Sequence, residues 1–136
     1  MLVVDASAVT ELVLRRPAGD VVSEHLAGHG FALHAPHLLD VEVLSALRRL
    51  VSSREATAER AGEAIADLLD LPIERYPHDI LVPRVWQLRE NFSAYDASYI
   101  ALAEAVADEP VPLLTADERL ARAIADLVEV PVLLAA

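Results

Sequence analysis

Short apolar runs alternate with longer segments of helical spacing along the whole chain. Apolar runs of this kind are typical of buried strands and predict five of them, at residues 2–4, 31–35, 71–76, 111–114 and 130–134. In the segments between them, apolar residues recur every three or four positions, which predicts helices, over residues 6–14, 19–27, 40–52, 57–71, 79–90, 93–107 and 116–125. Since strands and helices alternate, we expect an α/β protein with a mainly parallel sheet.

Prolines and acidic residues refine these boundaries. Pro36 is expected to end the second strand, Pro72 interrupts the third, and Pro83 is expected to lie in the first turn of its helix. The helix over 57–71 carries acidic residues on the side opposite its apolar positions. We interpret this acidic run as a solvated helix face and not as a site.

Length and composition predict a packed protein of one domain, residues 1–136. Of the 136 residues, 54% are hydrophobic and 24% are charged, which excludes a disordered chain. The longest stretch without Asp, Glu, Lys or Arg covers residues 25–39 and contains His, Gly and Pro, so no membrane span is expected. The first residues lack the basic start of a signal peptide, and we therefore expect a cytoplasmic chain.

Two residue types are missing, and each absence excludes a class of chemistry. Without cysteine there are no disulfides, thiolate nucleophiles or Cys-based zinc sites. All 11 basic residues are arginine, so mechanisms that need a lysine amine are excluded as well. The formal net charge of -11 opposes nonspecific binding to a polyanion and favours a basic partner or bound cations.

Four acidic residues stand where parallel strands end or helices begin. Asp5 and Asp117 follow predicted strands, whereas Glu42 and Asp96 fall in the first turns of predicted helices. In an open parallel sheet these ends meet at one edge, where ligands bind. Carboxylates that gather there without basic neighbours need cations. The four acids are therefore our candidate site.

Each acid also has a structural interpretation. Asp5 is placed to start an Asx turn, and Asp96 to pair with Ser93 in a capping box. Glu42 and Asp117 are first-turn acids of the kind that a helix dipole favours. Taken singly, none of the four separates a structural from a functional role.

Two details favour the functional interpretation. Thr115 and Glu118 match a T-x-x-E capping box, so we expect that Asp117 is not needed to cap its helix. Asp5 interrupts an apolar N-terminus at the end of a strand, where a charge is costly to bury.

Two acid-using α/β families fit the chain poorly. A haloacid-dehalogenase phosphatase needs a second aspartate two residues after the first, and this chain has Ser7 there. A two-component receiver domain, the third function that we consider, relies on a lysine, and this chain has none.

Four motifs, in order, resemble the PIN-domain ribonucleases, in particular the VapC-type toxins of bacterial toxin-antitoxin modules. They are Val3–Ala8, Pro36–Glu42 followed by Leu44 and Leu47-Arg48-Arg49, Tyr95–Ala103, and Leu114–Leu120. The resemblance covers nearly the full chain and implies a three-layer α/β/α domain with a central five-stranded, mainly parallel sheet. It also implies a metal-dependent nuclease site built from Asp5, Glu42, Asp96 and Asp117. The chain departs from the pattern at Ser45, where many relatives carry Asn.

Oxygen-only ligands suit Mg²⁺, or Mn²⁺, and either ion supports phosphodiester hydrolysis at neutral pH. We expect Asp5 and Asp96 to bind the ion directly and Glu42 and Asp117 to bind it directly or through water, one of them orienting the nucleophile. Two hydroxyl residues are candidates for hydrogen bonds to a ligand or phosphate, Ser7 and Thr115; a local turn and an N-cap are their structural alternatives.

Six arginines near the motifs are candidates for phosphate contacts: Arg15, Arg16, Arg48, Arg49, Arg119 and Arg122. Arg48 and Arg49 follow Glu42 by roughly 9 to 10 Å along the same predicted helix. Each arginine is more often a surface residue than a phosphate ligand. His25 and His29 are four residues apart, but glycines end the helix around them, so we do not expect a zinc pair.

The resemblance also predicts partners. They are an RNA substrate, a cognate antitoxin that lays a segment along a groove and places a basic side chain near the acids, and a second copy of the chain in a homodimer. The alternative function is a binding module that keeps the fold without the activity, and the complete set of four acids disfavours it.

Overall fold

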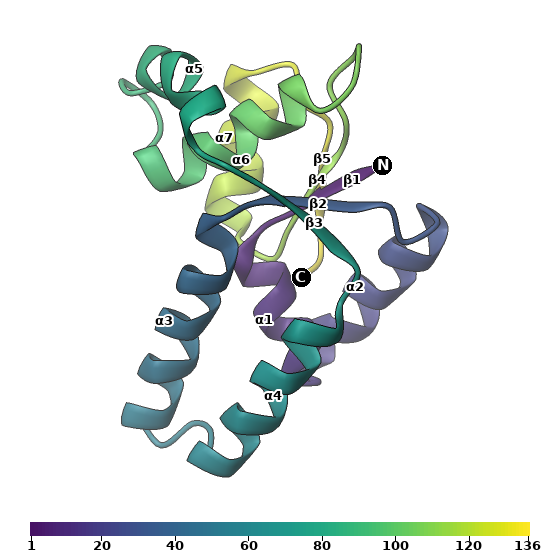
Figure 1. The fold of residues 1–136 in the computed structure, drawn as a ribbon, viewed down its shortest axis with the longest axis vertical. Coiled ribbons are helices and arrows are strands. Elements are labelled where there is room, and N and C mark those ends of the chain that lie inside the picture. The colour runs from purple at the N-terminus through teal and green to yellow at the C-terminus, as the bar shows by residue number, and fades with distance from the viewer.

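Five parallel strands form one sheet in the computed structural model, which describes residues 1–136 (Figure 1). The strands are β1 (Leu2–Val4), β2 (Leu33–Pro36), β3 (Ile73–Tyr76), β4 (Leu113–Thr115) and β5 (Val132–Leu134). Their order across the sheet is β3-β2-β1-β4-β5, and every neighbouring pair is parallel. The α/β class with a five-stranded parallel sheet, expected from the sequence, is confirmed.

The strand order reverses beside β1, the central strand. Val3 pairs with His34 of β2 on one side and with Leu113 of β4 on the other. The chain first moves outward from β1 to β2 and β3, and then crosses back to place β4 on the opposite side of β1. Ligand crevices in open parallel sheets form at the carboxyl ends of the strands at such a reversal. The topology therefore directs attention to the ends of β1 and β4.

Helices cover both faces of the sheet. Helices α1 to α4 lie on one side of it and α5 to α7 on the other, which makes three layers (Figure 1). Their bounds are α1 (Ala6–Val13), α2 (Pro17–Gly28), α3 (Leu38–Ser52), α4 (Ala58–Asp70), α5 (Val82–Gln87), α6 (Ala94–Ala105) and α7 (Glu118–Leu127), with a 3₁₀ turn at Asp79–Leu81. None of them combines the length and apolar character that a membrane crossing requires.

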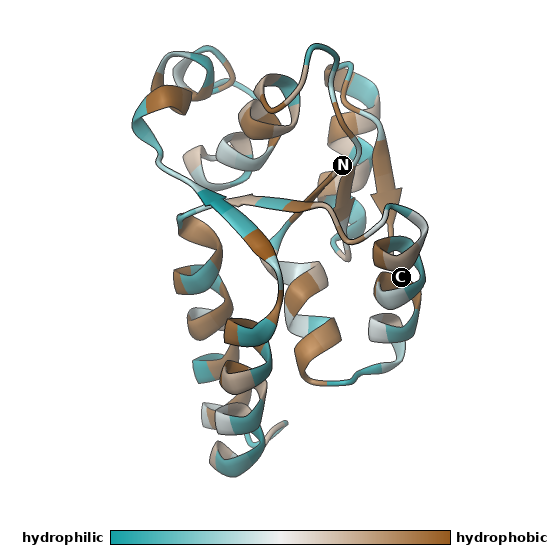
Figure 2. Cartoon of the chain, turned by 45° about the vertical axis from the view of Figure 1, so that its right-hand side comes forward, coloured by the Kyte–Doolittle hydropathy of each residue, from teal (hydrophilic) through white to brown (hydrophobic).

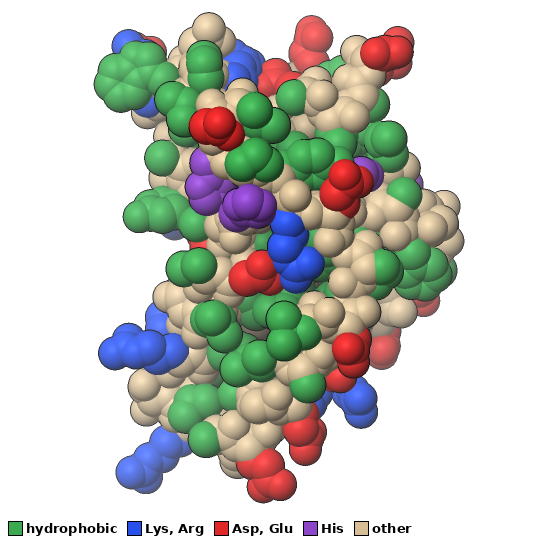
Figure 3. Space-filling view, viewed as in Figure 1, with side chains coloured by type: hydrophobic (Ala, Val, Ile, Leu, Met, Phe, Trp, Pro, Cys, Tyr) green, Lys and Arg blue, Asp and Glu red, His purple; other side chains and the backbone are tan.

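The core lies on both sides of β1 and along α6. Residues 2–4 are fully buried, and so is the stretch Ala97–Ala103 of α6, which packs against β1, β2 and β4. In Figure 2 the strands behind β3 are mostly brown, β3 itself is largely teal, and several helices are brown on one side and teal on the other. On the surface seen in Figure 3, apolar side chains lie among scattered acidic and arginine side chains.

Most predicted boundaries differ from the structure by one to three residues. Strand β3 begins at Ile73, so Pro72 precedes this strand and does not interrupt it. The helix expected over 79–90 is a 3₁₀ turn followed by the six-residue α5, with Pro83 in the first turn of α5 as predicted. Helix α3 begins at Leu38, two residues earlier than expected, so Glu42 lies in its second turn and not in its first. Pro36 is the last residue of β2 and pairs with Tyr76 of β3, whereas the pairing of β2 with β1 ends at His34.

Candidate active site

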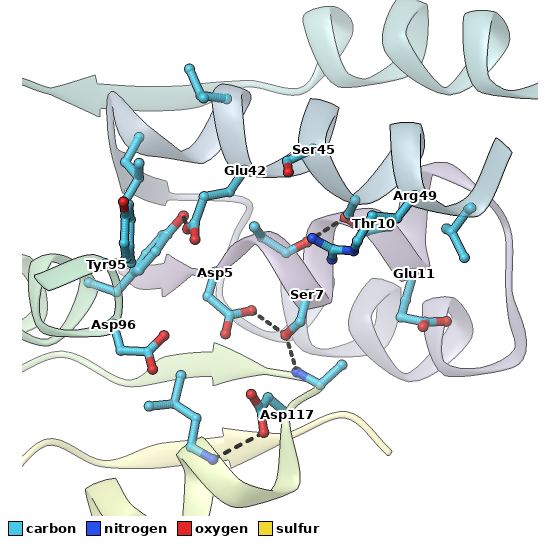
Figure 4. Close-up of a pocket in the computed structure, with 18 of the residues that line it drawn as sticks. Asp5, Ser7, Thr10, Glu11, Glu42, Ser45, Arg49, Tyr95, Asp96 and Asp117 are labelled. Carbon is cyan, nitrogen blue, oxygen red and sulfur yellow. Dashed lines mark hydrogen bonds between the residues drawn. The ribbon is translucent and has the colours of Figure 1, made fainter. Parts of the chain in front are cut away.

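A cleft of about 710 Å³ opens at the carboxyl ends of β1 and β4, between α1, α3, α6 and the start of α7 (Figure 4). All four predicted acids line it: Asp5, Glu42, Asp96 and Asp117. Each comes from a different part of the chain, and Figure 4 shows the four carboxylates around a common space. The structure thus brings together every acid that the sequence analysis singled out.

Asp5 joins a structural role to its place in the cleft. It is the N-cap of α1, where its Oδ1 accepts hydrogen bonds from the Ala8 N–H at 3.0 Å and the Ser7 hydroxyl at 2.7 Å. Its Oδ2 accepts a hydrogen bond from the Thr115 hydroxyl at 2.5 Å. The side chain is only 5% exposed, and this burial raises the pKa of Asp5 to about 6 although the three hydrogen bonds oppose the shift. The carboxylate is therefore held rigidly at an energetic cost.

Ser7 and Thr115 connect the start of α1 to the turn between β4 and α7. The Ser7 hydroxyl accepts a hydrogen bond from the Ala116 N–H at 2.9 Å and lies 3.1 Å from Thr115 Oγ1. Thr115 is fully buried at the end of β4, and its Oγ1 also accepts the Asp117 N–H at 3.0 Å. Their hydroxyls orient Asp5 and the turn that carries Asp117.

The predicted cap of α7 is wrong, and the structure corrects it. Asp117 itself is the N-cap, with its Oδ1 accepting hydrogen bonds from the N–H groups of Arg119 and Leu120 at 2.9 and 3.1 Å. Thr115 is not available for this role because its hydroxyl already serves Asp5 and the Asp117 N–H. Like Asp5, Asp117 both caps a helix and lines the cleft.

Asp96 lies at the start of α6. Ser93 is the N-cap of this helix and accepts a hydrogen bond from the Asp96 N–H at 3.1 Å, as the capping pattern predicts. The cap depends on the Asp96 backbone, so its carboxylate extends beside the cleft. Burial raises the pKa of Asp96, and the nearby Asp117 raises it further.

Glu42 is held by a residue that the sequence analysis did not assign to the site. The hydroxyl of Tyr99 donates a hydrogen bond to Glu42 Oε1 at 2.6 Å, and the Tyr99 side chain is 1% exposed. Burial and then Glu42 itself raise the pKa of Tyr99, which keeps the phenol protonated as a donor. One signal was present in the sequence, because Tyr99 follows Asp96 by three residues and so shares its helix face.

Replacing Tyr99 by Phe is expected to raise the pKa of Glu42. Burial already raises this pKa, while the Tyr99 hydrogen bond lowers it. The Tyr99→Phe variant should also lose about 1 kcal/mol of unfolding free energy, the usual net contribution of one hydrogen bond. Titration of the Glu42 carboxyl by NMR measures the first effect and urea unfolding the second. An unchanged Glu42 titration would contradict the role that we assign to Tyr99.

The donor chemistry of the cleft fits a hard divalent cation. Its acids offer only oxygen ligands, and the pKa values of Asp5, Glu42 and Asp96 are raised, as expected for buried carboxylates that repel one another. No three Asp, Glu or His side chains are grouped closely enough to hold an ion between them. Mg²⁺ in proteins is commonly held by one or two carboxylates, with water completing its shell. The residues present therefore suit such an ion.

Two of the six candidate arginines line the cleft, Arg16 and Arg49. Arg16 forms a salt bridge with Glu11, which also lines the cleft, and the distance from Arg16 Nη1 to Glu11 Oε1 is 3.8 Å. Arg49 forms no salt bridge. The other four do not line the cleft: Arg15, Arg48, Arg119 and Arg122. The Nδ1 atom of His29 lies 2.8 Å from the backbone oxygen of His25.

Comparison with known proteins decides the family. The model of the PIN domain family matches residues 2–125. The chain belongs to the PIN domain family. Among its relatives, Ribonuclease VapC1 of Mycobacterium tuberculosis (strain ATCC 25618 / H37Rv) is 47% identical over 122 residues, which are 89% of each chain. Ribonuclease VapC12 of the same strain is 39% identical over 122 residues, covering 90% of this chain and 91% of the other.

Solved structures show the same PIN fold. Mycobacterium tuberculosis VapC20, described as a toxin that cleaves the sarcin-ricin loop, superposes with a TM-score of 0.65 at 15% identity, over 90% of this chain and 95% of that one. The PAE2754 protein of Pyrobaculum aerophilum superposes with a TM-score of 0.62 at 21% identity, over 96% of this chain and 81% of that one. The family resemblance drawn from the four sequence motifs is confirmed.

Proposed function

We propose that this PIN domain protein is an endoribonuclease that requires Mg²⁺ or Mn²⁺ and acts as the toxin of a toxin-antitoxin pair. One observation carries the proposal: four carboxylates from four separate elements line a single cleft where the strand order reverses. The ribonuclease names of relatives that are 39 to 47% identical support the choice of RNA as substrate.

Each carboxylate has a role in this proposal. Asp5 and Asp96 would hold the ion directly, and Glu42 and Asp117 would contact it directly or through water. When bound, such an ion would neutralise charge on the phosphoryl oxygens. It would also lower the pKa of the water bound to it, so that this water can act as a nucleophile at neutral pH. Asp117 uses its Oδ1 to cap α7, which fixes the direction of its carboxylate toward the cleft.

The protein itself supplies orientation. Asp5 receives three hydrogen bonds, and its ligand geometry is set before any ion or substrate binds. Tyr99 holds Oε1 of Glu42, and the carboxylate can accept a proton from water at its other oxygen. Because burial raises the pKa of Glu42 above its ordinary value, this carboxylate is a stronger base than one in water.

Cleavage of RNA tests the proposal directly. Total RNA incubated with the protein in millimolar Mg²⁺ or Mn²⁺ should be cut at defined internal sites, and EDTA should stop the reaction because the carboxylates alone do not activate water. Sequencing of the new RNA ends identifies the class of RNA that is cut. Cleavage that persists in EDTA would contradict the metal requirement, and no cleavage under any condition would favour the inactive binding module.

An antitoxin and a second copy of the chain are the protein partners in this proposal. Several large apolar side chains on α3 and α5 are exposed, which favours a protein partner: Val41, Leu44, Val82 and Trp86. A basic side chain from an antitoxin would neutralise the same carboxylates that otherwise hold the ion. The homodimer stays a prediction.

A further inference from the structure

The cleft continues beyond the carboxylates along one wall of α3. Glu42, Ala46 and Arg49 recur at spacings of four and three residues and line this wall together. Figure 4 shows the side chain of Arg49 extended into the space between α3 and α1, close to Thr10. The cleft therefore has an acidic end at the strands and a basic group farther along α3.

Arg49 lines the cleft and forms no salt bridge, a combination that no other arginine of the chain shows. Five arginines form salt bridges with carboxylates: Arg15, Arg16, Arg60, Arg75 and Arg84. Arg89 stacks over Trp86. Among the arginines without a carboxylate partner, Arg49 is the one that lines the cleft. The residue is exposed to solvent.

The spacing along α3 separates Arg49 from the reacting end of the cleft. It follows Glu42 by seven residues, or about 10 Å along the helix axis. This offset places the Arg49 backbone beyond the acids, while its charge still reaches Glu42 and lowers the pKa of that carboxyl. A strand whose cleaved phosphate lies at the acids would bring a neighbouring phosphate toward Arg49. We propose that Arg49 binds an RNA phosphate next to the one that is cleaved, an inference that rests on the proposed ribonuclease function.

The charge balance of the protein gives the physical reason for such a contact. The chain carries a formal net charge of -11, and the carboxylates in the cleft repel an incoming phosphate. A guanidinium is planar and permanently charged, and it can donate two parallel hydrogen bonds to one phosphate. Arg49 thus offsets part of this repulsion on the α3 wall of the cleft.

The neighbouring residue provides a matched control. Arg48 lies on the same helix and is also exposed, but it does not line the cleft. The variants to compare are Arg49→Ala, Arg49→Lys and Arg48→Ala, each in the full chain carrying Asp96→Asn so that the RNA stays intact. The probe is a fluorescently labelled single-stranded RNA of mixed sequence, and its affinity is measured by anisotropy over a range of salt concentrations.

Arg49→Ala should weaken RNA binding roughly tenfold, as expected for the loss of a charge-assisted phosphate contact. It should also lower the slope of log affinity against log salt by about 0.7, the contribution of one phosphate contact to a single strand. Arg49→Lys should keep the salt slope because the positive charge remains. It should lose part of the RNA affinity because an ammonium cannot donate two parallel hydrogen bonds to one phosphate. Arg48→Ala should change neither quantity.

Two results would overturn the inference. One is equal binding by the Arg49→Ala and Arg48→Ala proteins. The other is weaker binding by Arg49→Ala with an unchanged salt slope, which would indicate a structural effect and not a lost phosphate contact.

Cleavage assays without the Asp96→Asn change separate the two proposals. If the wild type cuts RNA and Arg49→Ala raises KM no more than Arg48→Ala does, only the inference about Arg49 fails; if the wild type neither cuts nor binds RNA, the proposed function fails and the inference falls with it.

Discussion

Asp96→Asn should lower metal-dependent RNA cleavage about a thousandfold or more and leave the fold intact. The exchange removes a ligand charge that the ion needs, and a bound ion supplies several kcal/mol of charge stabilisation to this reaction. The cap of α6 survives because Ser93 accepts its hydrogen bond from the Asp96 backbone N–H, which the variant keeps. Rates of RNA cleavage at equal folded fraction, monitored by circular dichroism, measure the effect.

Asp20→Asn is the matched control for this experiment. Asp20 is likewise an acid in the first turn of a helix, but it is exposed and lies outside the cleft. This variant should cleave RNA like the wild type. Millimolar Mn²⁺ should raise the melting temperature of the wild type and of Asp20→Asn, because an ion that binds the native state stabilises it. It should not raise that of Asp96→Asn. If Asp96→Asn and Asp20→Asn cleave equally well, Asp96 does not belong to the site.

Asp5→Asn should make the metal-free protein more stable at neutral pH, by up to about 3 kcal/mol, while abolishing cleavage. Burial raises the pKa of Asp5 from its ordinary value of 3.8 to about 6, and each unit of this difference corresponds to about 1.4 kcal/mol. The folded wild type binds this proton more tightly than the unfolded chain does. Its stability therefore falls as the pH rises from about 4 to about 6 and stays lower above that range.

An asparagine carries no charge to bury and can keep the two hydrogen bonds that Oδ1 accepts, while the Thr115 hydroxyl loses its acceptor at Oδ2. Its oxygen can accept from the Ala8 N–H and the Ser7 hydroxyl, and asparagine is a good N-cap. Urea unfolding in EDTA should therefore show equal stability of wild type and variant near pH 4 and a growing advantage of the variant up to about pH 6. A variant that is less stable than the wild type at neutral pH would show that the hydrogen bonds outweigh the cost of burying the charge.

The class of fold and the gathering of the four acids in one cleft could be predicted from the sequence alone. Apolar runs and helical spacing are local consequences of burial, so they predicted all five strands and the α/β class. The carboxyl ends of parallel strands meet at one edge whatever the details of packing. For this reason, acids as far apart in sequence as Asp5 and Asp117 could be assigned to one cleft before the structure was known.

Helix boundaries were less accessible to the sequence. The segment over 79–90 has helical spacing, yet its α helix spans only Val82–Gln87, and none of the residues of α5 is buried. Most helical stability in proteins comes from packing of a buried face, and this segment has little of it. The start of α3 was missed because His37 precedes it without a side-chain cap, so no local signal marks the boundary.

Only the tertiary structure decided how the site is held together and which arginine enters it. The hydrogen bond from Tyr99 to Glu42 joins residues 57 positions apart, and that from Thr115 to Asp5 joins residues 110 apart. Arg48 and Arg49 are equivalent in the sequence, but only Arg49 faces the cleft. Successive side chains on a helix point about 100° apart, so the rotation of α3 against its neighbours selects one of the two. That rotation is set by contacts between distant parts of the chain, which local sequence patterns do not encode.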